Sequence, residues 1–118
     1  MSFEILIIDD NSDIRLILDE LITEAGYKTR MAANYNQALT EIDKKLPDVA
    51  IIDVKLDKGD NDGIELLTHI KKKNSDIPVI IISGHANIDM AIKSLKSGAF
   101  EFIQKPFDKD RLLNFIKR

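Results

Sequence analysis

Five side chains with phosphate and metal chemistry lie at or shortly after the ends of short apolar runs in this 118-residue chain. They are Asp9, Asp10, Asp53, Ser83 and Lys105. Carboxylates bind hard cations, while a hydroxyl and an ammonium hold phosphate oxygens. A carboxylate is also a nucleophile that can form an aspartyl phosphate. The residue types therefore indicate a site for phosphoryl chemistry, provided that the fold brings them together.

The apolar runs alternate with longer amphipathic stretches, and this alternation defines the elements that must position the five side chains. Short apolar runs predict buried strands over residues 3–8, 49–52, 78–82 and 100–103, and residues 28–32 are a weaker strand candidate. The run 28–32 is mixed in character, which favours a sheet edge. Asn34 and Asp108 are expected helix N-caps, and Gly26 and Gly98 are expected to end helices.

Each strand is followed by a predicted helix, recognised by apolar residues three and four apart. In the first helix this stripe is Ile14, Ile17, Leu18, Leu21, Ile22 and Ala25. In the fourth it is Ile88, Ala91, Ile92 and Leu95. Five strand–helix repeats imply an α/β fold with a parallel, doubly wound sheet covered on both faces. Ligands of such sheets bind beyond the carboxyl ends of the strands.

The carboxyl ends of parallel strands share one edge of the sheet, so the five polar side chains are expected in one shallow pocket. Loops are polar in general, and this simpler interpretation explains any one of the five. It explains the whole set less well. Three carboxylates repel one another unless a cation joins them, and oxygen ligands without His or Cys favour Mg²⁺. Asp53, alone at the end of the central strand, is the best-placed nucleophile.

Composition excludes several classes of protein. The net charge of −3 disfavours a non-specific nucleic-acid binder, and the absence of Cys excludes disulfide scaffolds and thiol enzymes. The chain length corresponds to one domain. No apolar run approaches the roughly 20 residues of a membrane span. The first residues lack a basic segment, so no secretory signal is expected and a cytoplasmic location is predicted.

The arrangement resembles the receiver domain of two-component response regulators over essentially the whole chain. The resemblance rests on ILIIDDN, the aspartate in VAIIDV, the turn at Asp62-Gly63, the hydroxyl in IIISG, and FEFIQKPF. It implies the (βα)5 flavodoxin-like fold with strand order 2-1-3-4-5. It also implies that Asp53 accepts a phosphoryl group from a sensor histidine kinase. The domain is then a switch that catalyses only its own phosphorylation and dephosphorylation, assisted by Mg²⁺.

The resemblance assigns further roles residue by residue. Asp10 and Asp53 would bind Mg²⁺ directly, Asp9 mainly through water, and Lys55 through its backbone carbonyl. Ser83 would be the switch hydroxyl, and Lys105 would bind the phosphoryl group. The Lys105–Pro106 peptide bond would be cis. Phe102, three residues before Lys105, would be the aromatic switch residue. A plain core role is the alternative for Phe102, and Phe100, two residues earlier, is expected on the same face of the strand.

The segment from IIISG to QKPF resembles the NtrC and NtrX group of nitrogen regulators. Receivers usually carry Pro four residues after the phosphoacceptor and Gly eight after it. Here the fourth residue after Asp53 is Asp57, and the glycine, Gly63, lies ten residues after Asp53. The longer loop, Leu56 to Asn61, resembles the NtrX branch. Residues 1–118 are thus expected to be a receiver domain cut from a longer regulator with ATPase and DNA-binding output domains, acting on transcription.

Two other functions compete with the switch. A Mg²⁺-dependent phosphatase of the haloacid-dehalogenase type also uses an aspartyl phosphate, but it carries D-x-D where this chain has DDNSD. A receiver-like module that binds partners without phosphorylation would not need the complete acidic set. Homodimerisation through the surface of the fourth helix, fifth strand and fifth helix is also expected. No P-loop or helix-turn-helix segment is present, so this chain is not expected to hydrolyse ATP or bind operator DNA by itself. Direct contact with nucleic acid or membrane is not expected either.

Overall fold

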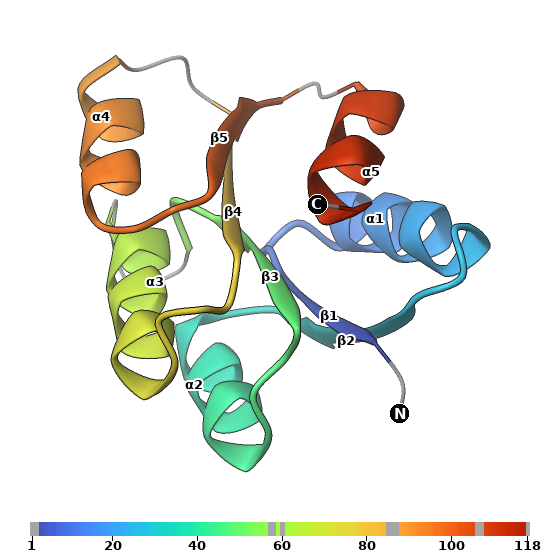
Figure 1. Ribbon diagram of the computed structural model, residues 1–118, viewed down its shortest axis with the longest axis horizontal. Helices are drawn as coiled ribbons and strands as arrows, with labels where there is room; N and C mark the ends of the chain where they lie inside the picture. Colours follow the sequence, from blue (N-terminus) through green and yellow to red (C-terminus); the bar gives the residue numbers. More distant parts are fainter. Residues whose placement is uncertain (1–2, 57–58, 60, 85–87, 106–107, 118) are drawn as a thin grey trace.

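The protein forms a five-stranded parallel sheet in the order β2-β1-β3-β4-β5, which confirms the expected fold and strand order (Figure 1). The computed structural model describes residues 3–56, 59, 61–84, 88–105 and 108–117. The strands are β1 (Glu4–Ile8), β2 (Lys28–Ala32), β3 (Val49–Asp53), β4 (Val79–Ser83) and β5 (Glu101–Gln104). Asp53 and Ser83 therefore end their strands rather than follow them. The mixed β2 lies at one edge of the sheet, as its composition indicated.

The helices cover both faces of the sheet, as helical crossovers between parallel strands require. They are α1 (Ser12–Glu24), α2 (Tyr35–Lys44), α3 (Asp62–Lys73), α4 (Ile88–Lys96) and α5 (Lys109–Lys117). Figure 1 shows α1 and α5 on one side, with α2, α3 and α4 on the other. Because side chains alternate along a strand, each of β1, β3 and β4 contributes to two separate cores.

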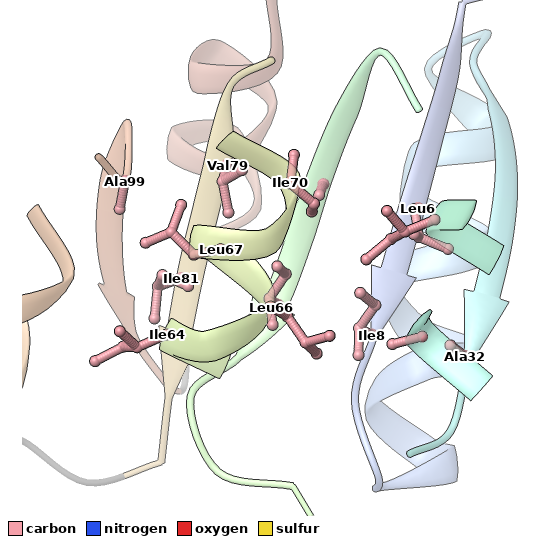
Figure 2. Packing of buried hydrophobic residues seen from close by; sticks show 14 of the residues in the cluster. Leu6, Ile8, Ala32, Ile64, Leu66, Leu67, Ile70, Val79, Ile81 and Ala99 are labelled. Carbon is pink, nitrogen blue, oxygen red and sulfur yellow. The ribbon is translucent and has the colours of Figure 1, made fainter. Parts of the chain in front are cut away.

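The larger core lies between the sheet and α2 and α3, and Figure 2 shows how α3 fills it. Leu66, Leu67 and Ile70 of α3 are fully buried in the same cluster as Val79 and Ile81 of β4. The second core joins the sheet to α1 and α5 through residues such as Leu18, Ile22, Leu112 and Ile116. With both faces of β3 and β4 packed, the carboxyl ends of these strands are held rigidly for the site they carry.

The expected helix boundaries are largely confirmed by side-chain and backbone contacts. The Asn34 side chain accepts a hydrogen bond from the backbone N–H of Gln37, and Asp108 accepts from the N–H of Asp110. Gly26 and Gly98 have φ angles of 97° and 109°, the left-handed region that favours glycine after a helix. The second helix, α2, ends at Lys44, and the half-buried Leu46 packs on the core from beyond the helix.

Two predicted apolar stripes are not wholly buried. Ile17 of α1 is 44% exposed, because it lies about 100° around the helix from the fully buried Leu18. In α4 the expected stripe largely faces outward: Ile88 is 79% exposed, and Ile92 and Leu95 are each 46% exposed. The buried residue of α4 is instead Ser94. Since α4 lies beside the edge strand β5, only a narrow side of the helix meets the core.

Phe100 and Phe102 do not share a face, contrary to the expectation from strand alternation. Phe100 precedes β5 and is 42% exposed, and its ring meets Phe115 of α5 edge-on with centroids 6.2 Å apart. Phe102 lies within β5 and packs on the core on the α3 side. The alternation rule fails here because β5 begins only at Glu101.

Among the described residues, no helix combines the length and the apolar character that crossing a membrane would require.

A carboxylate and phosphate site at the carboxyl edge of the sheet

The carboxyl ends of β1, β3, β4 and β5 surround a cavity of about 190 Å³. It is lined by Asp10, Asp53, Val54, Lys55, Ser83, Gly84 and Lys105. Four of the five residues singled out from the sequence thus line one cavity. The fifth, Asp9, is fully buried, and its carboxylate accepts a hydrogen bond from Lys105 of the cavity lining. The expected convergence of the polar strand ends is therefore what the fold produces.

Asp53 is the last residue of β3 and is only 6% exposed. Its Oδ1 accepts a long hydrogen bond of 3.4 Å from the backbone N–H of Lys55, and its Oδ2 lies 3.3 Å from Nζ of Lys105. Burial, followed by the negative charge of Asp9, raises the pKa of Asp53 to about 6, although Lys105 acts in the opposite direction. Without a cation, the ionised nucleophile is therefore destabilised by its surroundings.

Asp9 is held through all of its polar groups. Its backbone N–H donates to the Ala32 carbonyl at 3.2 Å, and its own carbonyl accepts from Nη1 of Arg15 at 2.7 Å. Its Oδ1 accepts from the backbone N–H of Asn11 at 2.9 Å, while Oδ2 lies 2.8 Å from Nζ of Lys105. These contacts satisfy the carboxylate within the protein. They are consistent with a contribution to a bound cation through charge and water rather than through direct contact.

Lys105 joins β5 to the acidic cluster. Its backbone N–H donates to the Ser83 carbonyl at 2.7 Å, which extends the β4–β5 pairing just past the end of the strand. Its side chain is 17% exposed and bridges Asp9 and Asp53. Burial alone would lower the pKa of the ammonium, but the hydrogen bond with Asp9 and the charges of both carboxylates raise it overall. Lys105 therefore stays charged at neutral pH.

The three aspartates fit a divalent cation. One carboxylate oxygen from each of Asp9, Asp10 and Asp53 lies within 4.8 Å of the other two. With Lys105 they leave a net charge of −2 when all four groups are ionised, which a divalent ion neutralises. Oxygen donors alone, with the exposed Asp10 accessible to water, are the ligands that Mg²⁺ prefers over softer metals. The donor set thus supports the expected Mg²⁺ site.

The remaining sequence candidates differ in how close they come to the site. Ser83, at the end of β4, is 3% exposed and lines the cavity. Lys55 also lines it, while the role of its carbonyl stays a prediction. Phe102 is half-buried on the core two positions before the end of β5, outside the cavity lining. The proposed cis bond at Pro106 and part of the loop Leu56 to Asn61 lie outside the described residues.

Three residues that had no expected site role also contact Asp9 or Asp53. Asn11 caps α1 and also orients Asp9 through its N–H. Arg15, one helical turn further, binds the Asp9 carbonyl. Gly63 packs on the backbone of Asp53, where a Cβ would lie 2.5 Å from the carbonyl oxygen. The Asn11 cap has a sequence signal, Asn before an amphipathic run, but the Arg15 contact depends on tertiary geometry.

The family model described as the response regulator receiver domain matches residues 5–117. The chain therefore belongs to the receiver domain family of two-component response regulators. This membership confirms the resemblance inferred from the motifs, and it favours the phosphorylation switch over the dehalogenase-type phosphatase.

Relatives with regulatory names support the same assignment. The chain is 40% identical over 118 residues to the nitrogen assimilation regulatory protein NtrX of Azorhizobium caulinodans, covering 100% of this chain and 26% of that protein. It is 38% identical to sporulation initiation phosphotransferase F of Bacillus subtilis, covering 100% of this chain and 94% of that protein. A crystal structure of NtrX from Brucella abortus matches with a TM-score of 0.89 at 38% identity, over 100% of this chain and 26% of that one. The chain thus spans about a quarter of its NtrX relatives.

Proposed function

We propose that Asp53 is the phosphoacceptor of this receiver domain, with a phosphohistidine of a sensor kinase as the donor. The proposal rests on one observation: Asp53 lines a single cavity with Asp10, Ser83 and Lys105 at the carboxyl edge of the sheet. A carboxylate oxygen of Asp53 forms the new P–O bond while the P–N bond breaks, and the histidine nitrogen keeps the bonding electron pair. The product is an aspartyl phosphate.

The residues around Asp53 supply the charge balance for this transfer. Asp10 and Asp53 would hold Mg²⁺, together with the Lys55 carbonyl and, through water, Asp9. When bound, Mg²⁺ neutralises the carboxylates and the incoming phosphoryl oxygens. The Lys105 ammonium forms ion pairs with Asp9 and Asp53 and is therefore within reach of a phosphoryl group on Asp53. Ser83 lines the same cavity. Movement of Ser83 and Lys105 toward the new charge, with Phe102 as the aromatic switch residue, would shift the equilibrium of the α4, β5 and α5 surface.

Phosphorylation is tested by incubating the protein with Mg²⁺ and acetyl phosphate, followed by intact-mass measurement. We expect a gain of one phosphoryl group in the wild type and none in Asp53→Ala. Asp13→Ala, which removes an exposed acid from the first turn of α1, is the matched control and should be modified normally. Modification of Asp53→Ala to the wild-type level would refute the assignment of Asp53. No modification of the wild type with any donor would favour the phosphorylation-independent module.

We further propose that the switch controls transcription in a cytoplasmic regulator with ATPase and DNA-binding output domains, because NtrX relatives extend well beyond the matched region. In this regulator the α4, β5 and α5 surface would form a homodimer. Its support is the outward apolar face of α4, Ile88, Ile92 and Leu95. Light scattering should show a phosphorylation-dependent dimer that Ile92→Asp abolishes and Leu16→Asp, at a similarly exposed position of α1, does not.

A second candidate is a phosphotransferase that passes its phosphoryl group on. It is favoured by the match to sporulation initiation phosphotransferase F, of which the chain covers 94%. Here the aspartyl phosphate would be an intermediate rather than the final signal. Mixing the phosphorylated chain with histidine-containing phosphotransfer proteins from the same organism separates the two functions. Rapid transfer of the phosphoryl group to such a protein supports the phosphotransferase, and retention on Asp53 with dimer formation supports the transcription regulator.

A further inference from the structure

Arg15 makes a side-chain contact to Asp9 that neither the cavity nor the phosphoryl chemistry accounts for. Its Nη1 reaches back from the second turn of α1 and donates to the Asp9 carbonyl at 2.7 Å. The side chain is half-buried, and the backbone N–H of Arg15 donates to the Asn11 carbonyl at 3.1 Å. A charged hydrogen bond of this length, partly shielded from water, is stronger than a neutral one. Arg15 therefore restrains the chain just where β1 passes into α1.

The restraint acts on Asp10 through the peptide bond. The Asp9 carbonyl and the Asp10 N–H belong to one planar unit, so a donor that fixes the carbonyl also fixes the direction in which the Asp10 Cα leaves β1. Asp10 itself is exposed, and its carboxylate must come within 4.8 Å of those of Asp9 and Asp53 to complete the cluster. The cation affinity of such an exposed side chain depends strongly on whether the backbone that carries it is already oriented before binding.

Asp9 is consequently held by two cations from different elements. Lys105 of the β5 end binds its Oδ2 at 2.8 Å, and Arg15 of α1 binds its carbonyl at 2.7 Å. Lys105 is expected to turn toward a phosphoryl group on Asp53. Arg15 bonds to backbone, so its contact does not depend on the phosphorylation state. The β1–α1 junction would thus keep its shape while the opposite wall of the site rearranges.

We propose that Arg15 is a positioning residue for the cation site, which orients Asp10 toward Asp53 by binding the Asp9 carbonyl. The proposal rests on the proposed Mg²⁺ site and extends it to a residue outside the ligand set. Two other roles for Arg15 predict different effects of its removal on Mg²⁺ affinity. If it acted only through its positive charge, its removal would strengthen cation binding. If it only stabilised α1, its removal would lower the unfolding free energy and leave cation affinity unchanged.

The test is Mg²⁺ affinity, measured by calorimetric titration of metal-free protein. We expect Arg15→Gln, which loses the charge and the reach, to weaken Mg²⁺ binding about tenfold, as loss of residues supporting a ligand commonly does. Arg15→Lys keeps the charge and one donor and should recover part of the affinity. Lys28→Gln removes an exposed cation from β2 and is the control for charge alone. It should bind Mg²⁺ as the wild type does.

A second readout needs no metal. In metal-free protein the amide resonance of Asp10 should shift in Arg15→Gln, less in Arg15→Lys, and not at all in Lys28→Gln. Unchanged or tighter Mg²⁺ binding by a folded Arg15→Gln variant, with an unmoved Asp10 amide, overturns the positioning role and leaves the cation site intact. Absence of Mg²⁺ binding by the wild type overturns the cation site and the role of Arg15 together.

Discussion

Gly63 lies against the backbone of Asp53 so closely that a Cβ on it would be 2.5 Å from the Asp53 carbonyl oxygen and 2.6 Å from the Val54 Cα. Its own N–H donates to the Val54 carbonyl at 2.9 Å. The start of α3 is therefore docked directly on the strand end that carries the proposed phosphoacceptor. The contacting atoms are all backbone, which cannot move aside as a flexible side chain could.

Gly63→Ala should consequently both destabilise the protein and impair phosphorylation. Overpacking against rigid surroundings costs about 1–3 kcal/mol of unfolding free energy, measured by urea denaturation. Displacement of the β3 end should also slow modification of Asp53 by acetyl phosphate. Gly59→Ala is the control, because its Cβ would meet only Asp62 Oδ1 at 3.9 Å. Equal stability of the two variants would contradict the close docking.

Asp53→Asn should stabilise the metal-free protein at alkaline pH. The folded-state pKa of Asp53 is about 6, above the usual 3.8, so its stabilising contribution is complete below pH 3.8 and is lost as pH rises through about 6. Above that pH the wild type carries a destabilising charge that Asn lacks. We expect the unfolding free energy of Asp53→Asn, relative to that of the wild type, to be about 1–3 kcal/mol higher at pH 8 than at pH 4. Urea denaturation in EDTA measures this difference. A stability difference independent of pH would contradict this.

Mg²⁺ should raise the unfolding free energy of the wild type, because an ion that binds only the folded state stabilises it by mass action. The gain is about 2.7 kcal/mol at a free concentration one hundred times the dissociation constant. Asp10→Asn should lose most of this gain. The matched variant Asp13→Asn, which changes an acid outside the cluster, should keep it. If Asp10→Asn retained the full thermal shift with Mg²⁺, Asp10 would not be a ligand.

Lys105→Ala should leave the domain folded and able to accept a phosphoryl group, while phosphorylation no longer changes dimer formation. The ammonium that would carry the signal from Asp53 to β5 is absent in this variant. Intact mass reports the modification, and light scattering reports the coupling. Lys72→Ala, at an exposed position in the last turn of α3, is the control. Preserved coupling in Lys105→Ala would show that the lysine role is wrong.

Ser94→Ala should stabilise the protein by about 1 kcal/mol, because its hydroxyl is fully buried in α4 and has no hydrogen-bond partner among the residues that the structure describes. The substitution removes this unsatisfied group and leaves only a small space. Ser75→Ala, at an exposed position, should change stability little. A loss of stability in Ser94→Ala, measured by thermal unfolding, would instead point to a partner for the hydroxyl.

The sequence by itself determined the sheet and the composition of the site. Apolar runs in β1, β3 and β4 require burial on both faces, and helical crossovers make neighbouring strands parallel. Those two facts bring Asp10, Asp53, Ser83 and Lys105 to one edge without any knowledge of side-chain contacts. Capping by Asn34 and Asp108 is equally local, since each acts on the N–H groups two or three residues further along.

Only the tertiary structure decided which apolar residues are buried and what holds each carboxylate. Periodicity marks the apolar side of α4 but not what covers it, so Ile88, Ile92 and Leu95 emerge at the surface. The burial that raises the pKa of Asp53 depends on how closely the neighbouring elements pack around it. The contact of Arg15 with Asp9 and that of Gly63 with Asp53 depend on where each helix starts relative to its strand. Such distances arise from packing the whole chain, and no local pattern encodes them.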